Sequence, residues 1–171
     1  MNLIVYPSGK AEWSQACVRC AVGFGGISYQ KREGDGVTPA GRFLLRRVFY
    51  RADRIEKPRT ILPLSTLSKT AGWCDSPSNA SYNKYVSLPF NGHHEKLWRN
   101  DAIYDLIAVV GYNDQPILPY AGSAIFLHVA TSKFGATEGC IAFYQPDLLK
   151  VIEEWRATSA VEIRNSNPRP A

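Results

Sequence analysis

The chain has 171 residues, 45% apolar and 20% charged, which suits one domain with a substantial core and excludes a broadly disordered or disulfide-dependent chain. The formal net charge is +5 at pH 7, and the four cysteines lack the second Cys-x-x-Cys pair that a zinc site with two such knuckles requires. There is no run of apolar residues long enough to span a bilayer, so we expect no transmembrane segment.

The first third of the chain predicts short strands separated by turns. Residues 3–22 have the pattern of a strand, a Pro-Ser-Gly turn and a second strand, on which Cys17 and Cys20 point to opposite faces. An ordered turn at 33–43 and a strand at 43–51 follow. The N-terminus lacks the basic start and long apolar stretch of a secretory signal, so we expect no signal peptide in this chain.

Much of the excess positive charge lies in residues 46–59. Two interpretations stay open: a solvated strand edge and loop, or a surface that attracts a polyanion. A carboxylate-rich cell wall is one such polyanion. We expect no nucleic-acid partner, because no nucleic-acid module is recognisable and the aromatic residues do not interleave with the basic ones.

The rest of the chain predicts more strands and one helix. Residues 65–101 are polar, without a helical period, and suggest a functional loop or lid. The apolar segments 103–113 and 122–132 predict central strands, and 160–165 a last short one. Residues 145–157 predict a helix that buries Leu148, Ile152 and Trp155 on one face. We therefore expect a single, mainly β domain over 1–171, with a flexible tail from about 165.

His128 and Cys140 are the candidate reactive pair. His128 lies near the end of an apolar strand, and Cys140 follows a glycine-bearing loop, so a hairpin-like return would bring them together. An imidazole can take the thiol proton, and an imidazolium would make Cys140 more reactive than Cys17, Cys20 and Cys74. Gly139 permits a backbone conformation closed to other residues, and nearby N–H groups can hold an oxyanion. From the spacing alone, a buried inert thiol is the favoured interpretation.

A family resemblance favours the nucleophile. His128 followed by Thr137-Glu138-Gly139-Cys140-Ile141 resembles the signature of the L,D-transpeptidase catalytic domain (YkuD) family. The segment KREGDGVTPAGRFLL (31–45) is similar to the family's Gly-Asp-x-x-Thr-Pro-x-Gly element, and the segments 72–86, 94–113 and 122–130 look like a compact bacterial branch. Together these segments span most of residues 20–150.

The resemblance implies an L,D-transpeptidase-like β-sandwich with few short helices and acyl transfer on peptidoglycan peptide stems. Cys140 would attack a diaminopimelate carbonyl to form a thioester, with His128 as the base and the Gly139 carbonyl orienting the imidazole. An amine acceptor gives a cross-link, and water gives an L,D-carboxypeptidase. The resemblance also implies inhibition by carbapenems, a bacterial cell-envelope (periplasmic) location, and neither cofactor nor metal.

Two positions depart from the family pattern. Many members have histidine where Glu138 stands and a substrate-binding arginine where Ala142 stands. Arg99 is our candidate for that role, with an ion pair to Asp101 or Asp105 as the alternative. The resemblance further places several residues of the matching segments at the substrate groove: Trp73, Tyr82, His94, Thr137 and Glu138.

Two other functional classes remain as alternatives. His93, His94 and Glu95, with His128, include enough ligand types for a zinc hydrolase, but adjacent residues on an extended chain point apart. A non-catalytic wall-binding module is disfavoured because His128 and Cys140 are both present in their motif.

Overall fold

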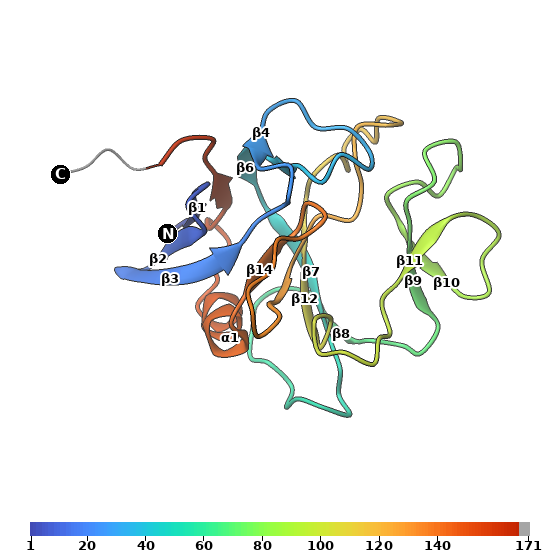
Figure 1. Ribbon diagram of the computed structural model, residues 1–171. Helices are drawn as coiled ribbons and strands as arrows, with labels where there is room; N and C mark the ends of the chain where they lie inside the picture. The colour runs from blue at the N-terminus through green and yellow to red at the C-terminus, as the bar shows by residue number, and fades with distance from the viewer. Residues whose placement is uncertain (168–171) are drawn as a thin grey trace.

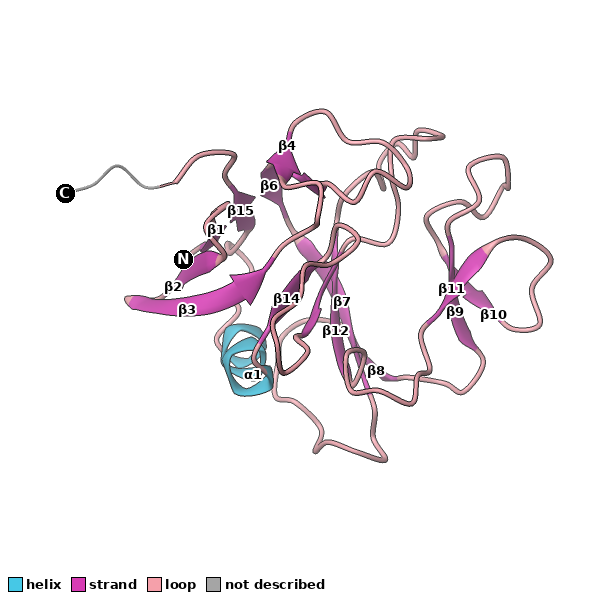
Figure 2. Cartoon of the chain, in the orientation of Figure 1, coloured by secondary structure: helices cyan, strands magenta, loops and turns pink. Residues whose placement is uncertain are grey.

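A curled ten-stranded sheet forms most of the computed structural model, which describes residues 1–167 (Figures 1 and 2). In spatial order its strands are β6 (Gly41–Phe43), β15 (Val161–Ile163), β1 (Leu3–Val5), β2 (Lys10–Trp13), β3 (Ala16–Ala21), β14 (Ile141–Phe143), β13 (Phe126–Val129), β12 (Leu106–Val110), β7 (Leu45–Tyr50) and β8 (Leu64–Thr66). A second sheet contains β10 (Tyr85–Ser87), β9 (Ala71–Cys74) and β11 (His94–Lys96), and β4 (Ile27–Ser28) pairs with β5 (Thr38–Pro39). The mainly β prediction is confirmed.

The central strands are apolar throughout because both of their faces are covered. In β12, Leu106, Ala108 and Val110 pack into one core cluster, whereas Ile107 and Val109 pack into a second cluster on the opposite face. Alternate residues of a strand point to opposite faces, so a strand between two cores reads as a continuous apolar run. This explains why segments 103–113 and 122–132 contain the central strands β12 and β13.

The first core cluster is closed by helix α1 (Gln145–Glu153), which lies beside β14 and β3 in Figure 2. Pro146 sits in its first turn with Asp147, where a missing N–H and a negative charge are both favourable. Leu148 and Ile152 are fully buried and Trp155 is 3% exposed, as predicted for one apolar face. Trp155 also stacks on Trp13 of β2, with ring centroids 5.5 Å apart.

The second core cluster is covered by the three-stranded sheet, which replaces the loop expected at 65–101 (Figure 1). Its strands have only three or four residues each, too short for a recognisable period. The buried side chain of Asn83 ties this sheet to the main one. It accepts hydrogen bonds from Trp73 Nε1 (2.9 Å) and Ala124 N (3.1 Å), and donates to the carbonyl oxygens of Tyr112 (3.0 Å) and Asn113 (2.8 Å).

Charges of the basic run 46–59 are used within the fold. Arg46 pairs with Asp114 at 2.6 Å and Arg54 with Asp105 at 2.9 Å. The Arg51 guanidinium binds Asp53 at 2.7 Å and lies over the Trp98 ring, 3.5 Å from its centroid. These pairs neutralise much of the charge that a polyanion would have met.

Three smaller expectations have definite outcomes. On β3, Cys17 is exposed and Cys20 is buried, as their spacing predicts. Of the tail predicted from 165, residues 168–171 lie outside the described part of the chain, and Asn167 accepts a hydrogen bond from Ser8 N at 3.0 Å. In residues 1–167, no helix is long and apolar enough to cross a membrane.

Replacing Asn83 with alanine should weaken the attachment of the three-stranded sheet to the main sheet. The change removes one buried and three part-buried hydrogen bonds, so we expect the free energy of unfolding to fall by about 2–4 kcal/mol. Urea denaturation of Asn83→Ala measures the loss. The exposed Asn100 is the matched control. An equal loss of unfolding free energy in Asn100→Ala would show that the Asn83 side chain does not link the two sheets in a way that matters for stability.

Candidate active site

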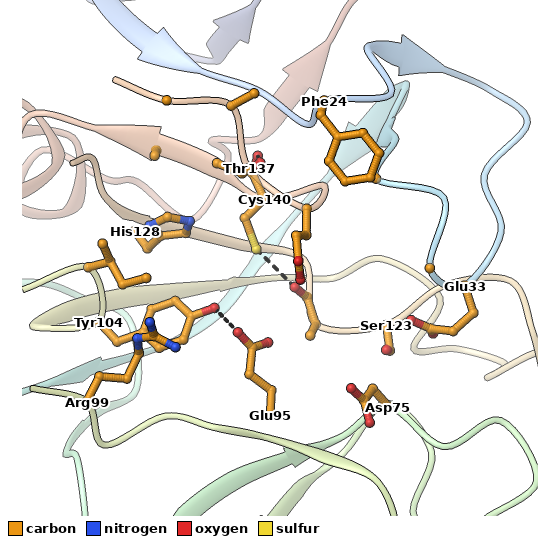
Figure 3. Close-up of a pocket in the computed structure, with 18 of the residues that line it drawn as sticks. Phe24, Glu33, Asp75, Glu95, Arg99, Tyr104, Ser123, His128, Thr137 and Cys140 are labelled. Carbon is orange, nitrogen blue, oxygen red and sulfur yellow. Dashed lines mark hydrogen bonds between the residues drawn. The ribbon is translucent and has the colours of Figure 1, made fainter. Parts of the chain in front are cut away.

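A pocket of about 640 Å³ lies between the main sheet and the three-stranded sheet (Figure 3). Five of the predicted site residues line it: Arg99, His128, Thr137, Glu138 and Cys140. Its volume is within the range of small-molecule sites, about 300–1,000 Å³. The structure therefore brings the predicted nucleophile and base to one cavity.

The register of two parallel strands places His128 and Cys140 on the same face. Strand β13 pairs in parallel with β14, with Leu127 opposite Ile141 and His128 opposite Ala142. Leu127 and Ile141 point into the first core cluster, so His128 and Cys140, one residue away from each, point to the other face. The expected hairpin-like return is wrong, because the strands are parallel. Residues 130–140 instead run back beside β3, where Thr137 bridges to Gly23.

The Cys140 thiol is held by backbone groups. Its Sγ donates to the Ala124 carbonyl at 3.1 Å and accepts from Phe126 N at 3.3 Å. Cys140 is 8% exposed. Burial, reinforced by the nearby Glu95 carboxylate, raises the pKa of the Cys140 thiol above its usual range. Burial thus favours the neutral thiol.

Burial also favours a neutral His128 imidazole. Burial lowers the pKa of His128 below its usual range. Its Nδ1 lies 2.9 Å from the Val129 carbonyl oxygen, and because a carbonyl can only accept, Nδ1 carries the hydrogen and Nε2 remains free to accept a proton. Burial of both groups therefore disfavours the expected imidazolium–thiolate pair in the resting state.

The turn before Cys140 is fixed by threonine hydroxyls. Gly139 has a φ of +126°, and a Cβ there would lie 2.8 Å from the Val37 carbonyl oxygen, so only glycine fits. The Gly139 carbonyl accepts from the Thr38 hydroxyl at 2.9 Å. The prediction that this carbonyl orients His128 is therefore wrong, because Val129 holds the imidazole. The Thr137 hydroxyl donates to the Cys140 carbonyl at 2.6 Å and accepts from Gly139 N at 3.2 Å, which also removes the Gly139 N–H from an oxyanion hole.

Arg99 meets both of the interpretations left open for it. It lines the pocket, and its guanidinium lies 5.7 Å from the centroid of the Tyr104 ring. It also binds the Asp101 carboxylate, at 2.7 Å for the shortest contact. Asp105, the other proposed partner, pairs with Arg54 instead. The positive charge of Arg99 is thus partly neutralised by Asp101.

Two predicted groove residues are buried behind the pocket. Trp73 packs edge-to-face on Phe126, 5.1 Å between centroids, and does not line the cavity. Tyr82 is 3% exposed; its hydroxyl donates to Glu33 and accepts from Gly122 N at 2.9 Å. Both groove assignments are wrong, because Trp73 packs into the second core cluster and Tyr82 is buried where its hydroxyl links Glu33 to Gly122.

His94 does not line the cavity, although the residues on either side of it do. Its ring packs against Phe90, with centroids 6.0 Å apart, whereas His93 and Glu95 line the pocket. Strand alternation explains this, because His94 pairs with Cys74 in β9 while Glu95 pairs with Trp73, which faces the main sheet. Among residues 1–167, no group of three or more His, Cys, Asp or Glu side chains is placed to hold a metal ion.

Sequence reasoning missed a buried pair beside the reactive residues. The Tyr104 hydroxyl donates to Glu95, and the Tyr104 ring meets His128 edge-on, 5.3 Å between centroids (Figure 3). Burial raises the pKa of Glu95. The only sequence signal was the match of 94–113 to the family, which does not single out Tyr104; Glu95 had been considered only as a metal ligand.

Comparison with known proteins identifies the family. The family model described as the L,D-transpeptidase catalytic domain matches residues 1–163. No curated protein matches. Among solved structures, the helical cell shape determining protein Pgp2 from Campylobacter jejuni is 12% identical, with a TM-score of 0.48 over 98% of this chain and 48% of that one. Its K307A mutant is 13% identical, with a TM-score of 0.41 over 98% and 47%. The chain thus spans about half the length of these solved chains. On the family match, the chain belongs to the L,D-transpeptidase catalytic domain family.

Proposed function

We propose that this domain is a peptidoglycan L,D-transpeptidase that uses Cys140 as its nucleophile. The thiolate attacks the carbonyl carbon at the L-centre of diaminopimelate, the third residue of a donor stem. The bond to the following D-amino acid breaks, and a thioester to Cys140 forms. An amine of a neighbouring stem then attacks the thioester, which releases the thiol and leaves a cross-link. This substrate places the enzyme in the bacterial cell envelope.

The observation that supports this proposal most strongly is the shared face of His128 and Cys140. Two adjacent parallel strands present both side chains to one cavity, and the free Nε2 of His128 is in the acceptor form that a general base needs. A packed structural cysteine would not require a histidine of the correct tautomer beside it. The family match over residues 1–163 supports the same reaction class.

A neutral pair implies that proton transfer accompanies attack. His128 takes the Cys140 proton as the thiol leaves the Ala124 carbonyl, and then delivers that proton to the departing amine. It next deprotonates the acceptor amine and reprotonates the thiol. With the Gly139 N–H bonded to Thr137, we assign the oxyanion to the Cys140 N–H. No preformed thiolate is required.

The same thioester can be hydrolysed. With water as the acceptor, the product is a trimmed stem and the domain acts as an L,D-carboxypeptidase. Mass spectrometry of muropeptides separates the two products, because a cross-linked dimer and a shortened stem differ in mass. Both outcomes use the same residues.

Cys140→Ala should abolish formation of either product while the fold is retained, because the covalent route disappears. The rate should fall by several orders of magnitude. Cys74→Ala is the matched control, since Cys74 is buried outside the pocket. Near wild-type turnover in Cys140→Ala, with a loss in Cys74→Ala, would overturn the assignment.

A carbapenem gives a second readout of the same residue. The family resemblance leads us to propose a covalent adduct at Cys140 with a carbapenem and little reaction with ordinary penicillins. Intact-mass spectrometry of wild type and Cys140→Ala reports the adduct directly.

His128→Ala should lower kcat/KM by about 10²–10⁴-fold, the usual effect of losing a positioned base. The lowered pKa keeps the imidazole neutral on the acid side, so activity should persist below the usual histidine value of about 6.5 before it declines. The decline of kcat/KM on the acid side of its pH profile measures this effect. His94→Ala, outside the pocket, is the matched control; an acid limb centred well above neutrality would contradict the role.

Alkylation should distinguish a neutral thiol from a preformed thiolate. Because burial raises the pKa of Cys140, iodoacetamide should modify Cys140 more slowly than the exposed Cys17 at about pH 7. Peptide mapping of both rates in the free protein is the measurement. Faster reaction at Cys140 would restore the imidazolium–thiolate pair.

A further inference from the structure

A buried lysine lies beside the turn that carries Cys140. Lys31, in the loop between β4 and β5, lines the pocket, and its side chain is only 3% exposed. A Cβ at Gly122 would lie 2.7 Å from the Lys31 Cε, and a Cβ at Gly139 would lie 3.4 Å from the Lys31 Nζ. The lysine side chain therefore packs against two positions that carry no side chain, and its ammonium reaches the residue before Cys140.

The Lys31 ammonium is held in place by Asp35. Its Nζ binds Asp35 Oδ1 at 2.9 Å. The Asp35 carboxylate also accepts hydrogen bonds from the backbone N–H groups of Arg32, at 2.6 Å, and Val37, at 2.9 Å, so it is anchored to its own loop. Lys31 lines the cavity and Asp35 does not. The ion pair thus presents its positive end to the cavity.

The loop does not use all of the hydrogen-bonding capacity of this lysine. An ammonium group carries three N–H donors. In residues 1–167, the Lys31 Nζ donates to Asp35 and, at the long distance of 3.4 Å, to the Arg32 carbonyl. A buried ion pair is weak evidence of a purely stabilising role, because removing both charges from water is expensive. The position of the ammonium at the active-site turn calls for a functional explanation.

The other cationic side chains at the cavity are better screened by solvent. The side chain of Arg99 is 39% exposed and that of His93 is 82% exposed, and they pair with Asp101 and Asp75. Water weakens the field of an exposed charge much more than that of a buried one. Lys31 therefore provides a cation whose field acts at short range through protein.

Attack by Cys140 places negative charge on a buried sulfur. Burial, followed by the Glu95 carboxylate, raises the pKa of the Cys140 thiol, and Glu138 adds to this effect. The Phe126 N–H and the Lys31 ammonium act in the opposite direction and lower that pKa. Fixed charges and dipoles aimed at developing charge are the most effective catalytic electrostatics in a buried site.

We propose that Lys31 promotes attack by stabilising the negative charge that develops on the Cys140 sulfur. The inference rests on the proposed function, because that charge develops in the reaction only if Cys140 is the nucleophile. Lys31 transfers no proton: His128 takes the thiol hydrogen, and the ammonium favours the charged sulfur that results. Asp35 opposes the effect, because its carboxylate partly offsets the lysine charge.

The alternative is that Lys31 and Asp35 only anchor their loop. In that case Lys31→Met and Asp35→Asn break the same ion pair and change the reactivity of Cys140 in the same direction. An electrostatic role predicts opposite signs. Methionine keeps an unbranched apolar chain and removes the positive charge, whereas asparagine removes the opposing negative charge and keeps an acceptor for the backbone N–H groups.

The experiment measures alkylation of Cys140 by iodoacetamide at about pH 7, relative to the exposed Cys17 of the same molecule. Peptide mapping gives both rates. Lys31→Met should lower the ratio about 10-fold, the change in thiolate fraction that one pKa unit produces, and Asp35→Asn should raise it. Lys57 is exposed and outside the cavity, so Lys57→Met is the matched control and should keep the ratio. Urea denaturation checks that each variant is folded.

Opposite changes in Lys31→Met and Asp35→Asn support the proposal, and every other pattern overturns it. Should Lys31→Met fail to fold, Asp35→Asn decides alone: a raised ratio supports the role of Lys31, and an unchanged or lowered ratio overturns it. Conversion of muropeptides by wild type tests the reaction separately. If wild type converts them and the alkylation pattern fails, the reaction stands without Lys31. If the pattern is found and wild type converts none, the proposed reaction fails while the effect of Lys31 on the thiol stands.

Discussion

The parallel register of β13 and β14 is the constraint on which the site depends. With Leu127 opposite Ile141, both apolar side chains enter the core under α1, and His128 and Cys140 are left on the other face. A slip of one residue would exchange the faces and bury the thiol in that core. The threonine hydroxyls around Gly139 hold the chain at the point where the second strand begins. Chemistry and core packing are therefore fixed by the same pairing.

That pairing requires a cover for its second face. The three-stranded sheet provides one, tied through Asn83, and the gap it leaves over His128 and Cys140 is the pocket. Burial beneath this cover favours the neutral form of both groups. Such a site does not rely on an ion pair between His128 and Cys140 at rest. Its reactivity depends on a substrate that displaces the Ala124 carbonyl from the thiol.

Sequence reasoning succeeded where a signal is local. The apolar runs marked the central strands, the helical period marked α1, and the glycine before Cys140 indicated a special backbone conformation. Sequence reasoning failed where the structure depends on which distant segments pair with one another. Strands of three or four residues gave no period at 65–101, and parallel pairing could not be distinguished from a hairpin. The large rings Trp73 and Tyr82 suit a groove or a core equally well, and only the position of the small sheet settles which.

The sign of the pocket follows from how charges are paired rather than from how many there are. Arginines of the basic run pair with carboxylates elsewhere on the domain. At the cavity, Lys31 pairs with Asp35 and Arg99 with Asp101, whereas His93 pairs with Asp75, which also lines the cavity. Four acidic residues line the cavity with these cations, and two of them, Glu33 and Glu95, accept hydrogen bonds from the hydroxyls of Tyr82 and Tyr104. A tyrosine hydroxyl holds an acid in place without cancelling its charge, whereas an arginine would cancel it. The charge at the cavity is therefore set by local pairing and not by the net charge of the chain.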